Sequence, residues 1–182
     1  MVAALAASVV LPTAAGATQP PVNPKAAAMK AFRDRADAYL SLHKKVADAL
    51  PPLKETSDPH KIADREKLLG EGIRAARPGA RPGDIFGEIA PVVVKTIRAD
   101  LRRRTATDRK ALFSEMPSPL PPLKVNDIYP STVPLATFPP SLLQTLPPLP
   151  DGLEYRFYGH HLILRDVKAN VVADMRRNVI PS

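Results

Sequence analysis

The 182-residue sequence contains neither cysteine nor tryptophan. Without cysteine the chain forms no disulfide bond and no thiolate metal site. Aromatic residues make up only 5% of the chain, so we expect a core built mainly from aliphatic side chains. Beyond the N-terminal segment, no apolar run approaches the roughly 20 residues that a membrane-spanning helix needs. The fold is therefore expected to be stabilised by packing alone.

The first 17 residues are typical of a secretory signal. Residues 2–11 are apolar or small and carry no charge, and Pro12 ends this run. Ala15-Gly16-Ala17 then has the small-x-small pattern that signal peptidases cleave. The first basic residue is Lys25, so the basic segment that usually opens a signal is missing, and a short buried helix is the alternative. We expect residues 1–17 to be a cleaved signal and the protein to be periplasmic or secreted.

Helical periodicity dominates residues 25–116, after a tether at 18–24 that holds three prolines. Apolar residues recur there at spacings of three and four, which predicts three or four helices. The first is expected over 25–50, with an apolar stripe formed by Met29, Phe32, Ala36, Tyr39, His43, Val46 and Leu50. Asp58 and Pro59 suit the N-cap and the first position of the second helix.

Proline and glycine residues indicate where the other predicted helices begin and where their helix propensity is low. Pro91 lies inside the third apolar pattern, so we expect a break there and a helix from Pro91 to about Arg104. A fourth, short helix is predicted over 107–114. Gly70 and Gly72 lie inside the second helix, where glycine lowers helix propensity but lets another backbone approach closely.

Residues 117–150 are interpreted as a proline-rich strap. Eleven of these 34 residues are proline and large apolar side chains alternate with them, which is typical of an extended segment packed on a core. The tetrapeptide Leu-Pro-Pro-Leu begins at Leu50, Leu120 and Leu146. We interpret it as a rigid connector, and a polyproline ligand for a partner groove is the alternative.

Residues 151–182 predict a three-stranded antiparallel meander. Apolar and polar residues alternate through 153–157 and 162–165, and a third short strand is expected over 171–175. Turns separate the strands, and the second turn ends at Asn170, a residue type that tolerates a left-handed backbone. The fold class is therefore expected to be α+β: a helical region, a strap and a C-terminal meander.

The histidines give a weak metal-binding pattern. His160 and His161 lie side by side at the expected hairpin tip and are the candidate ligands for nickel, copper or zinc. A zinc site needs three or four converging ligands, however, and neighbouring residues of a strand point to opposite faces. His43 lies on an apolar helix stripe and is expected to be a hydrogen-bonded core or boundary residue, whereas His60 is expected to be exposed near Asp58.

The strongest basic cluster lies between residues 95 and 110, in a chain with a net charge of +8. Two aspartates, Asp100 and Asp108, oppose seven basic residues: Lys95, Arg98, Arg102, Arg103, Arg104, Arg109 and Lys110. Such a surface attracts anionic partners. Phe113 is the only aromatic residue nearby for base stacking, so we expect no nucleic acid. The alternative role is to complement a helix dipole and solvate its end.

No catalytic or cofactor-binding pattern is present. No glycine-rich loop precedes a helix, and no serine lies in a nucleophile elbow. Asp166 and Asp174 flank the last predicted hairpin and Glu154 lies on the first predicted strand, but nothing places these carboxylates in a common cleft. Asp166 is better explained as a turn residue that accepts hydrogen bonds from nearby amides. We therefore expect no enzymatic activity and no cofactor.

Three stretches resemble a family of small, uncharacterised bacterial exported proteins: Pro82-Gly83-Asp84-Ile85-Phe86, residues 123–127 and residues 146–170. The resemblance covers most of the mature chain and implies export and a helix-then-hairpin order, but no activity. Residues 146–175 are also similar in layout to the C-terminal module of RcnB-type periplasmic proteins, which are linked to nickel and cobalt homeostasis. Asn170 stands where that module usually has glycine, and the rest of the chain does not match.

These patterns favour a non-enzymatic exported protein that acts by binding or packing in the cell envelope. Its expected partner is a protein or an anionic polymer. The alternative function is a periplasmic metal-homeostasis factor of the nickel and cobalt type that uses His160 and His161.

Overall fold

The computed structural model describes residues 23–181, which adopt an α+β fold. The signal expected at 1–17 lies outside the described residues. Within the described part, no helix combines the length and the apolar character needed to cross a membrane.

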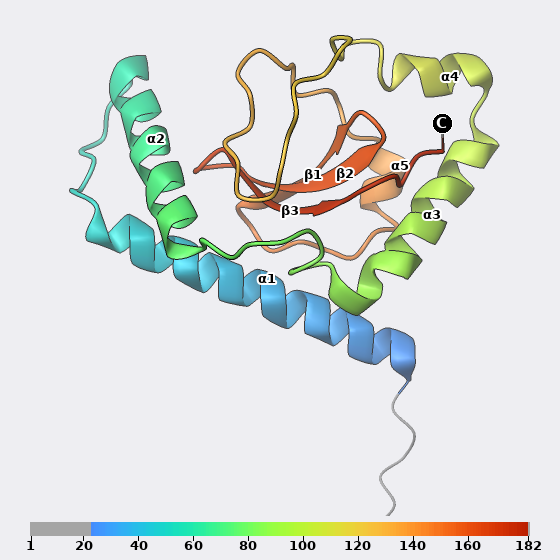
Figure 1. Cartoon of the computed structure of the whole chain (residues 1–182), viewed down its shortest axis with the longest axis horizontal. Coiled ribbons are helices and arrows are strands. Elements are labelled where there is room, and N and C mark those ends of the chain that lie inside the picture. Colours follow the sequence, from blue (N-terminus) through green and yellow to red (C-terminus); the bar gives the residue numbers. More distant parts are fainter. Residues whose placement is uncertain (1–22, 182) are drawn as a thin grey trace, which may run out of the picture.

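The helices of the N-terminal half frame the sheet on three sides (Figure 1). The longest, α1 (Pro24–Ala49), runs along one side, and α2 (Pro59–Ala76) and α3 (Ala90–Arg103) rise near its two ends. A short 3-10 helix, η1 (Gly87–Ile89), leads into α3, and α4 (Ala106–Ala111) follows it. The predicted order of helices is therefore confirmed.

Capping side chains explain where these helices begin. Asp58 accepts a hydrogen bond from the backbone N–H of His60, so α2 starts at Pro59 as predicted. Thr105 and Asp108 form a reciprocal capping box at the start of α4. Pro91 occupies the first turn of α3, where its missing N–H costs nothing, and the predicted break before it is η1.

The sheet is a three-stranded antiparallel meander, in the order β1 (Leu153–Tyr158), β2 (His161–Asp166) and β3 (Val171–Arg176). The pairing of β2 with β3 contains one register shift. Asn170 has a φ of 53°, which confirms the left-handed residue predicted for the second turn. The predicted meander is thus confirmed.

Each face of the sheet has its own apolar cluster. The first face packs against the helices, which contribute Ala28, Phe32, Ala36 and Tyr39 from α1, and Val93, Ile97 and Leu101 from α3. The second face packs under the strap, with Val125, Tyr129 and Val133 contacting Tyr158, Ile163, Val172 and Met175. Both faces are therefore buried, which explains why β2 and β3 have buried residues on both sides.

The strap also bonds to β3 and α2. The N–H of Asn126 donates to the carbonyl of Val172 at 2.8 Å, and the N–H of Val172 donates to Asp127 at 2.9 Å. The side-chain amide of Asn126 donates to the carbonyls of Arg74 and Arg77, at the C-terminal end of α2. The strap therefore joins the sheet to α2. It also contains a short helix, α5 (Pro140–Leu143), that the proline content did not predict.

All three Leu-Pro-Pro-Leu segments are bonded within the chain. In each, the first proline's carbonyl accepts a side-chain hydrogen bond: Pro51 from Arg65, Pro121 from Tyr158 and Pro147 from Tyr155. A proline lacks an N–H, so the carbonyl is its only backbone group that needs a partner. This arrangement favours the rigid-connector interpretation over that of a polyproline ligand.

Candidate anion-binding surface

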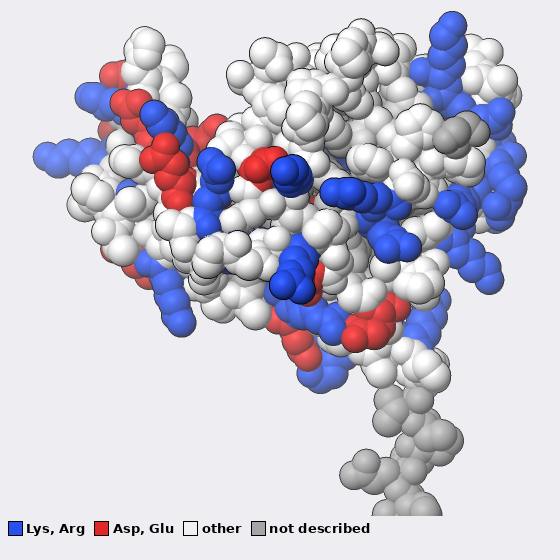
Figure 2. Space-filling model, in the orientation of Figure 1, with Lys and Arg blue, Asp and Glu red and all other residues white. Residues whose placement is uncertain are grey.

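The basic cluster predicted between residues 95 and 110 lies on α3, α4 and the turn between them. Figure 2 shows Lys and Arg side chains gathered over this side of the molecule. Five of the seven are exposed: Lys95, Arg102, Arg103, Arg109 and Lys110. The other two, Arg98 and Arg104, are partly buried. We call all seven residues together the basic face. Helical spacing of three and four residues aligns Lys95, Arg98 and Arg102 along one side of α3.

The two acidic residues of this region are already engaged. Asp100 accepts a hydrogen bond from Arg104 at 2.6 Å and another from Ser141 at 3.0 Å. Asp108 is the acidic member of the capping box with Thr105. Neither carboxylate neutralises the exposed residues of the basic face. The positive charge of these basic residues is therefore presented to solvent.

Two arginines of the basic face are held in place by backbone carbonyls. Arg98 donates to Val179 and Asn178 at 3.1 and 2.9 Å, which ties α3 to the chain after β3. Arg109 donates to the carbonyl of Arg104 at 2.9 Å, beyond the end of α3. A guanidinium has five N–H donors, so both side chains keep donors for another ligand.

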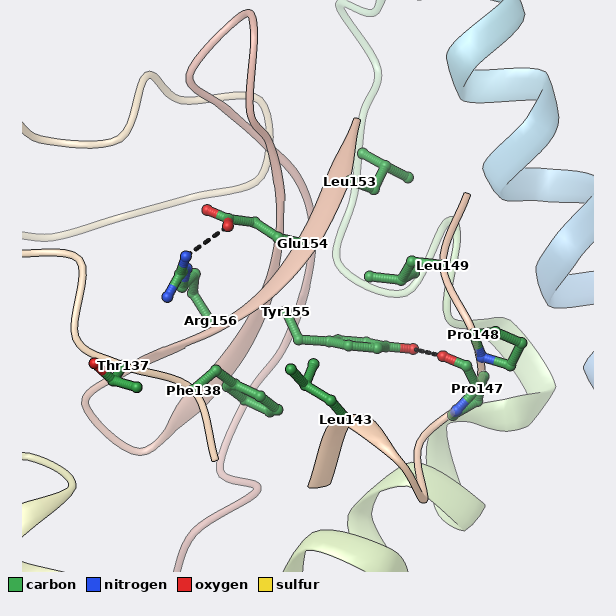
Figure 3. Close-up of a pocket in the computed structure, with 10 residues that line it drawn as sticks. All are labelled: Thr137, Phe138, Leu143, Pro147, Pro148, Leu149, Leu153, Glu154, Tyr155 and Arg156. Atoms are coloured by element: carbon green, nitrogen blue, oxygen red, sulfur yellow. Dashed lines mark hydrogen bonds and ion pairs between the residues drawn. The ribbon is translucent and has the colours of Figure 1, made fainter. Parts of the chain in front are cut away.

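A second candidate site is the cavity of about 390 Å³ between β1 and the strap (Figure 3). The Tyr155 ring crosses it and donates its hydroxyl hydrogen to Pro147 at 3.0 Å. Glu154 and Arg156 lie at one end and pair with each other at 2.6 Å. Tyr155 and Phe138 are only 3% and 6% exposed, so this cavity offers a ligand little aromatic surface, and its two charged lining residues are already paired.

Asp166 is a fully buried carboxylate with four donors. One oxygen accepts from the backbone N–H groups of Lys168 and Ala169, which confirms its predicted role in the turn. The other accepts from the Tyr39 hydroxyl at 2.9 Å and lies 2.6 Å from Nδ1 of His43. Burial, followed by the charge of Asp166, raises the pKa of Tyr39. His43 is thus a hydrogen-bonded boundary residue, as predicted, and the set anchors the β2–β3 turn to α1.

Asp174 anchors a different loop. Its two oxygens accept hydrogen bonds of 2.6–2.8 Å from the backbone N–H groups of Gly83, Ile85, Phe86 and Met175. Burial raises the pKa of Asp174, and the four amide donors act in the opposite direction. Asp166 and Asp174 therefore hold separate parts of the backbone, and neither is among the residues that line the cavity between β1 and the strap.

The candidate metal ligands His160 and His161 each have a ring nitrogen within hydrogen-bond distance of the C-terminal segment. Nδ1 of His160 lies 3.2 Å from the carbonyl of Ile180, and Nδ1 of His161 accepts from the backbone N–H of Asn178 at 3.1 Å. Burial and the nearby Arg177 lower the pKa of His161. Among residues 23–181, no group of three or more histidine or acidic side chains is placed to hold a metal ion.

The basic face was found from sequence, whereas the anchoring roles of Tyr39 and the 83–86 loop were missed. Charge clustering is local in the chain, but these anchors join residues about 90 to 130 positions apart. Comparison of the chain with family models, curated proteins and solved structures finds no match.

Proposed function

We propose that the chain is a non-enzymatic exported protein that binds an anionic polymer of the cell envelope through its basic face. The observation that carries the proposal is the charge imbalance on α3 and α4: Asp100 pairs with Arg104 and Asp108 caps α4, so the five exposed basic residues have neither aspartate as a partner. An extended polymer suits this face because its exposed cations follow both helices, so that several contacts form together and release counterions.

The buried carboxylates support a non-enzymatic function. Asp166 already has four hydrogen-bond donors, and Asp174 has four backbone amides. A general acid or base needs a proton-transfer partner within reach of a substrate. Both groups are instead saturated by the chain itself.

The polymer proposal is tested with polyphosphate and a sulfated polysaccharide as probes, over a series of salt concentrations. The test variant replaces four exposed residues of the basic face with glutamine: Lys95, Arg102, Arg103 and Lys110. The matched control replaces four exposed lysines elsewhere, Lys45, Lys54, Lys67 and Lys168, and so has the same net charge.

We expect the test variant to bind at least about tenfold more weakly and to depend less on salt, because exposed ionic contacts contribute up to about 1 kcal/mol each. The control should retain most of the affinity. Equal losses in the two variants would mean that net charge, and not the basic face, governs binding, and the proposal would then fail.

Export is tested on the N-terminus of the mature product. The proposal requires that intact-mass analysis of protein from the envelope or the medium find Thr18 as the first residue. A product that retains Met1 in those fractions would contradict signal cleavage.

A further inference from the structure

Two cavities share Ile180 in their linings, where the basic face meets the C-terminal segment. The first, of about 330 Å³, is lined by Arg98, Leu101, Arg102, Arg109, Ile180 and Pro181. The second, of about 340 Å³, includes Phe113, Met116, Leu120, His160 and Ile180 in its lining. Three cations thus surround one cavity, and apolar side chains dominate the other.

The cationic end is organised before any ligand binds. Arg98 and Arg109 are fixed by hydrogen bonds to backbone carbonyls, and Arg102 is exposed beside them on the last turn of α3. Groups that are already held in position lose little conformational entropy when they contact a ligand. The three guanidinium groups therefore suit a single anionic head group.

The apolar end distinguishes this site from the rest of the basic face. Leu101 is 4% exposed and lines the first cavity, while Phe113 and Met116 line the second and are partly buried against the core. A uniformly polar polymer gains nothing from such walls. An alkyl chain does, because each buried methylene contributes about 0.8 kcal/mol to transfer from water.

We infer that this pair of cavities binds an anionic amphiphile: a carboxylate or phosphate head at Arg98, Arg102 and Arg109, with its single alkyl chain passing over Ile180 toward Met116. Two observations support this inference: three arginines line the first cavity, and mainly apolar side chains line the second. It rests on the proposed function only in that Arg98, Arg102 and Arg109 also belong to the basic face.

The test is a chain-length series measured by calorimetry on the mature protein. The probes are alkyl carboxylates and monoalkyl phosphates of six, eight and ten carbons, all below their micelle concentrations, with inorganic phosphate as the headgroup alone. We expect the affinity to rise about fourfold per methylene. Comparison of the two head groups at equal chain length identifies the source of the anion. An affinity that does not change with chain length would overturn the inference.

Variants locate the site. Ile180→Asp places a like charge in the path of the alkyl chain and is expected to abolish the chain-length dependence, whereas Val167→Asp makes the same kind of change at an exposed apolar residue of the β2–β3 turn and should leave it intact. Pro181→Asp, at an exposed position, repeats the test if Ile180→Asp does not fold. Chain-length dependence that survives in the folded variant would refute the site.

The two proposals fail separately. Polyphosphate binding without chain-length dependence would leave the proposed function standing and remove the amphiphile site. Chain-length dependence that Ile180→Asp abolishes, in a protein that does not bind polyphosphate, would support the amphiphile site alone.

Discussion

Replacement of Asp174 with asparagine is predicted to destabilise the protein strongly. Each carboxylate oxygen accepts two backbone amides: one accepts Gly83 and Met175, and the other accepts Ile85 and Phe86. Asparagine has one oxygen and one NH₂ group. Whichever way the amide is oriented, two backbone N–H groups face a donor and lose their acceptor.

The expected cost follows from those two lost acceptors. A buried N–H without a partner costs about 1–3 kcal/mol, so the variant should lose about 2–6 kcal/mol of unfolding free energy. That is a large part of the roughly 5–15 kcal/mol that stabilises a typical domain. Hydrogen exchange should also accelerate at one pair of amides, either Gly83 and Met175 or Ile85 and Phe86, because that pair then faces the NH₂ group of asparagine.

Urea unfolding at constant pH measures the loss, with Asp84→Asn as the matched control on the same loop. Asp84 is exposed and accepts only the N–H of Arg81, which an asparagine oxygen also accepts. The control should therefore stay within about 0.5 kcal/mol of the wild type. If Asp174→Asn were no more destabilising than Asp84→Asn, at an unchanged denaturant slope, the four-amide account of this loop would be wrong.

Three further predictions concern the other anchoring contacts. Gly70→Ala should destabilise the fold by about 1–3 kcal/mol in urea unfolding, because its Cβ would lie 2.8 Å from a backbone oxygen, whereas Gly79→Ala, with no atom within 4 Å, should not. Tyr39→Phe should cost about 1–2 kcal/mol by the same assay, since it removes a buried donor to a carboxylate, and a neutral result would refute that role. Burial acts to raise the pKa of Glu154, but hydrogen bonds from Arg156 and Arg165 outweigh it and hold the pKa below 4.5. The contribution of Glu154 to stability is therefore present above that pH and is lost as the pH falls through its folded-state pKa, so Glu154→Gln should flatten the acid side of a stability–pH curve; an unchanged curve would contradict this.

The secondary structure was largely predictable from sequence because its signals are local. The apolar stripe of α1, the cap at Asp58 and the strand alternation after Leu153 each lie within a few residues of the element they define. Pro91 marked the start of α3 for the same reason. Helix ends were less exact: α4 ends at Ala111, three residues before the predicted position.

The tertiary anchors were not predictable, since no periodic pattern encodes them. Tyr39 lies 127 residues from Asp166, and Phe86 lies 88 residues from Asp174. In the sequence, Asp166 and Asp174 cannot be distinguished from ordinary turn or strand residues, because their hydrogen-bond donors come together only in the folded chain. The sequence predicted that another backbone segment could approach Gly70 closely. Only the structure identifies that neighbour as the carbonyl of Ala169.

The bonds between the strap and β3 bear on how this chain avoids aggregation. β3 is an outer strand, and the free N–H and C=O groups along such a strand invite pairing with another molecule. Residues 126–129 already occupy part of that edge. They also precede β3 in the chain, so during N-to-C emergence the protecting segment is present before the strand that needs protection.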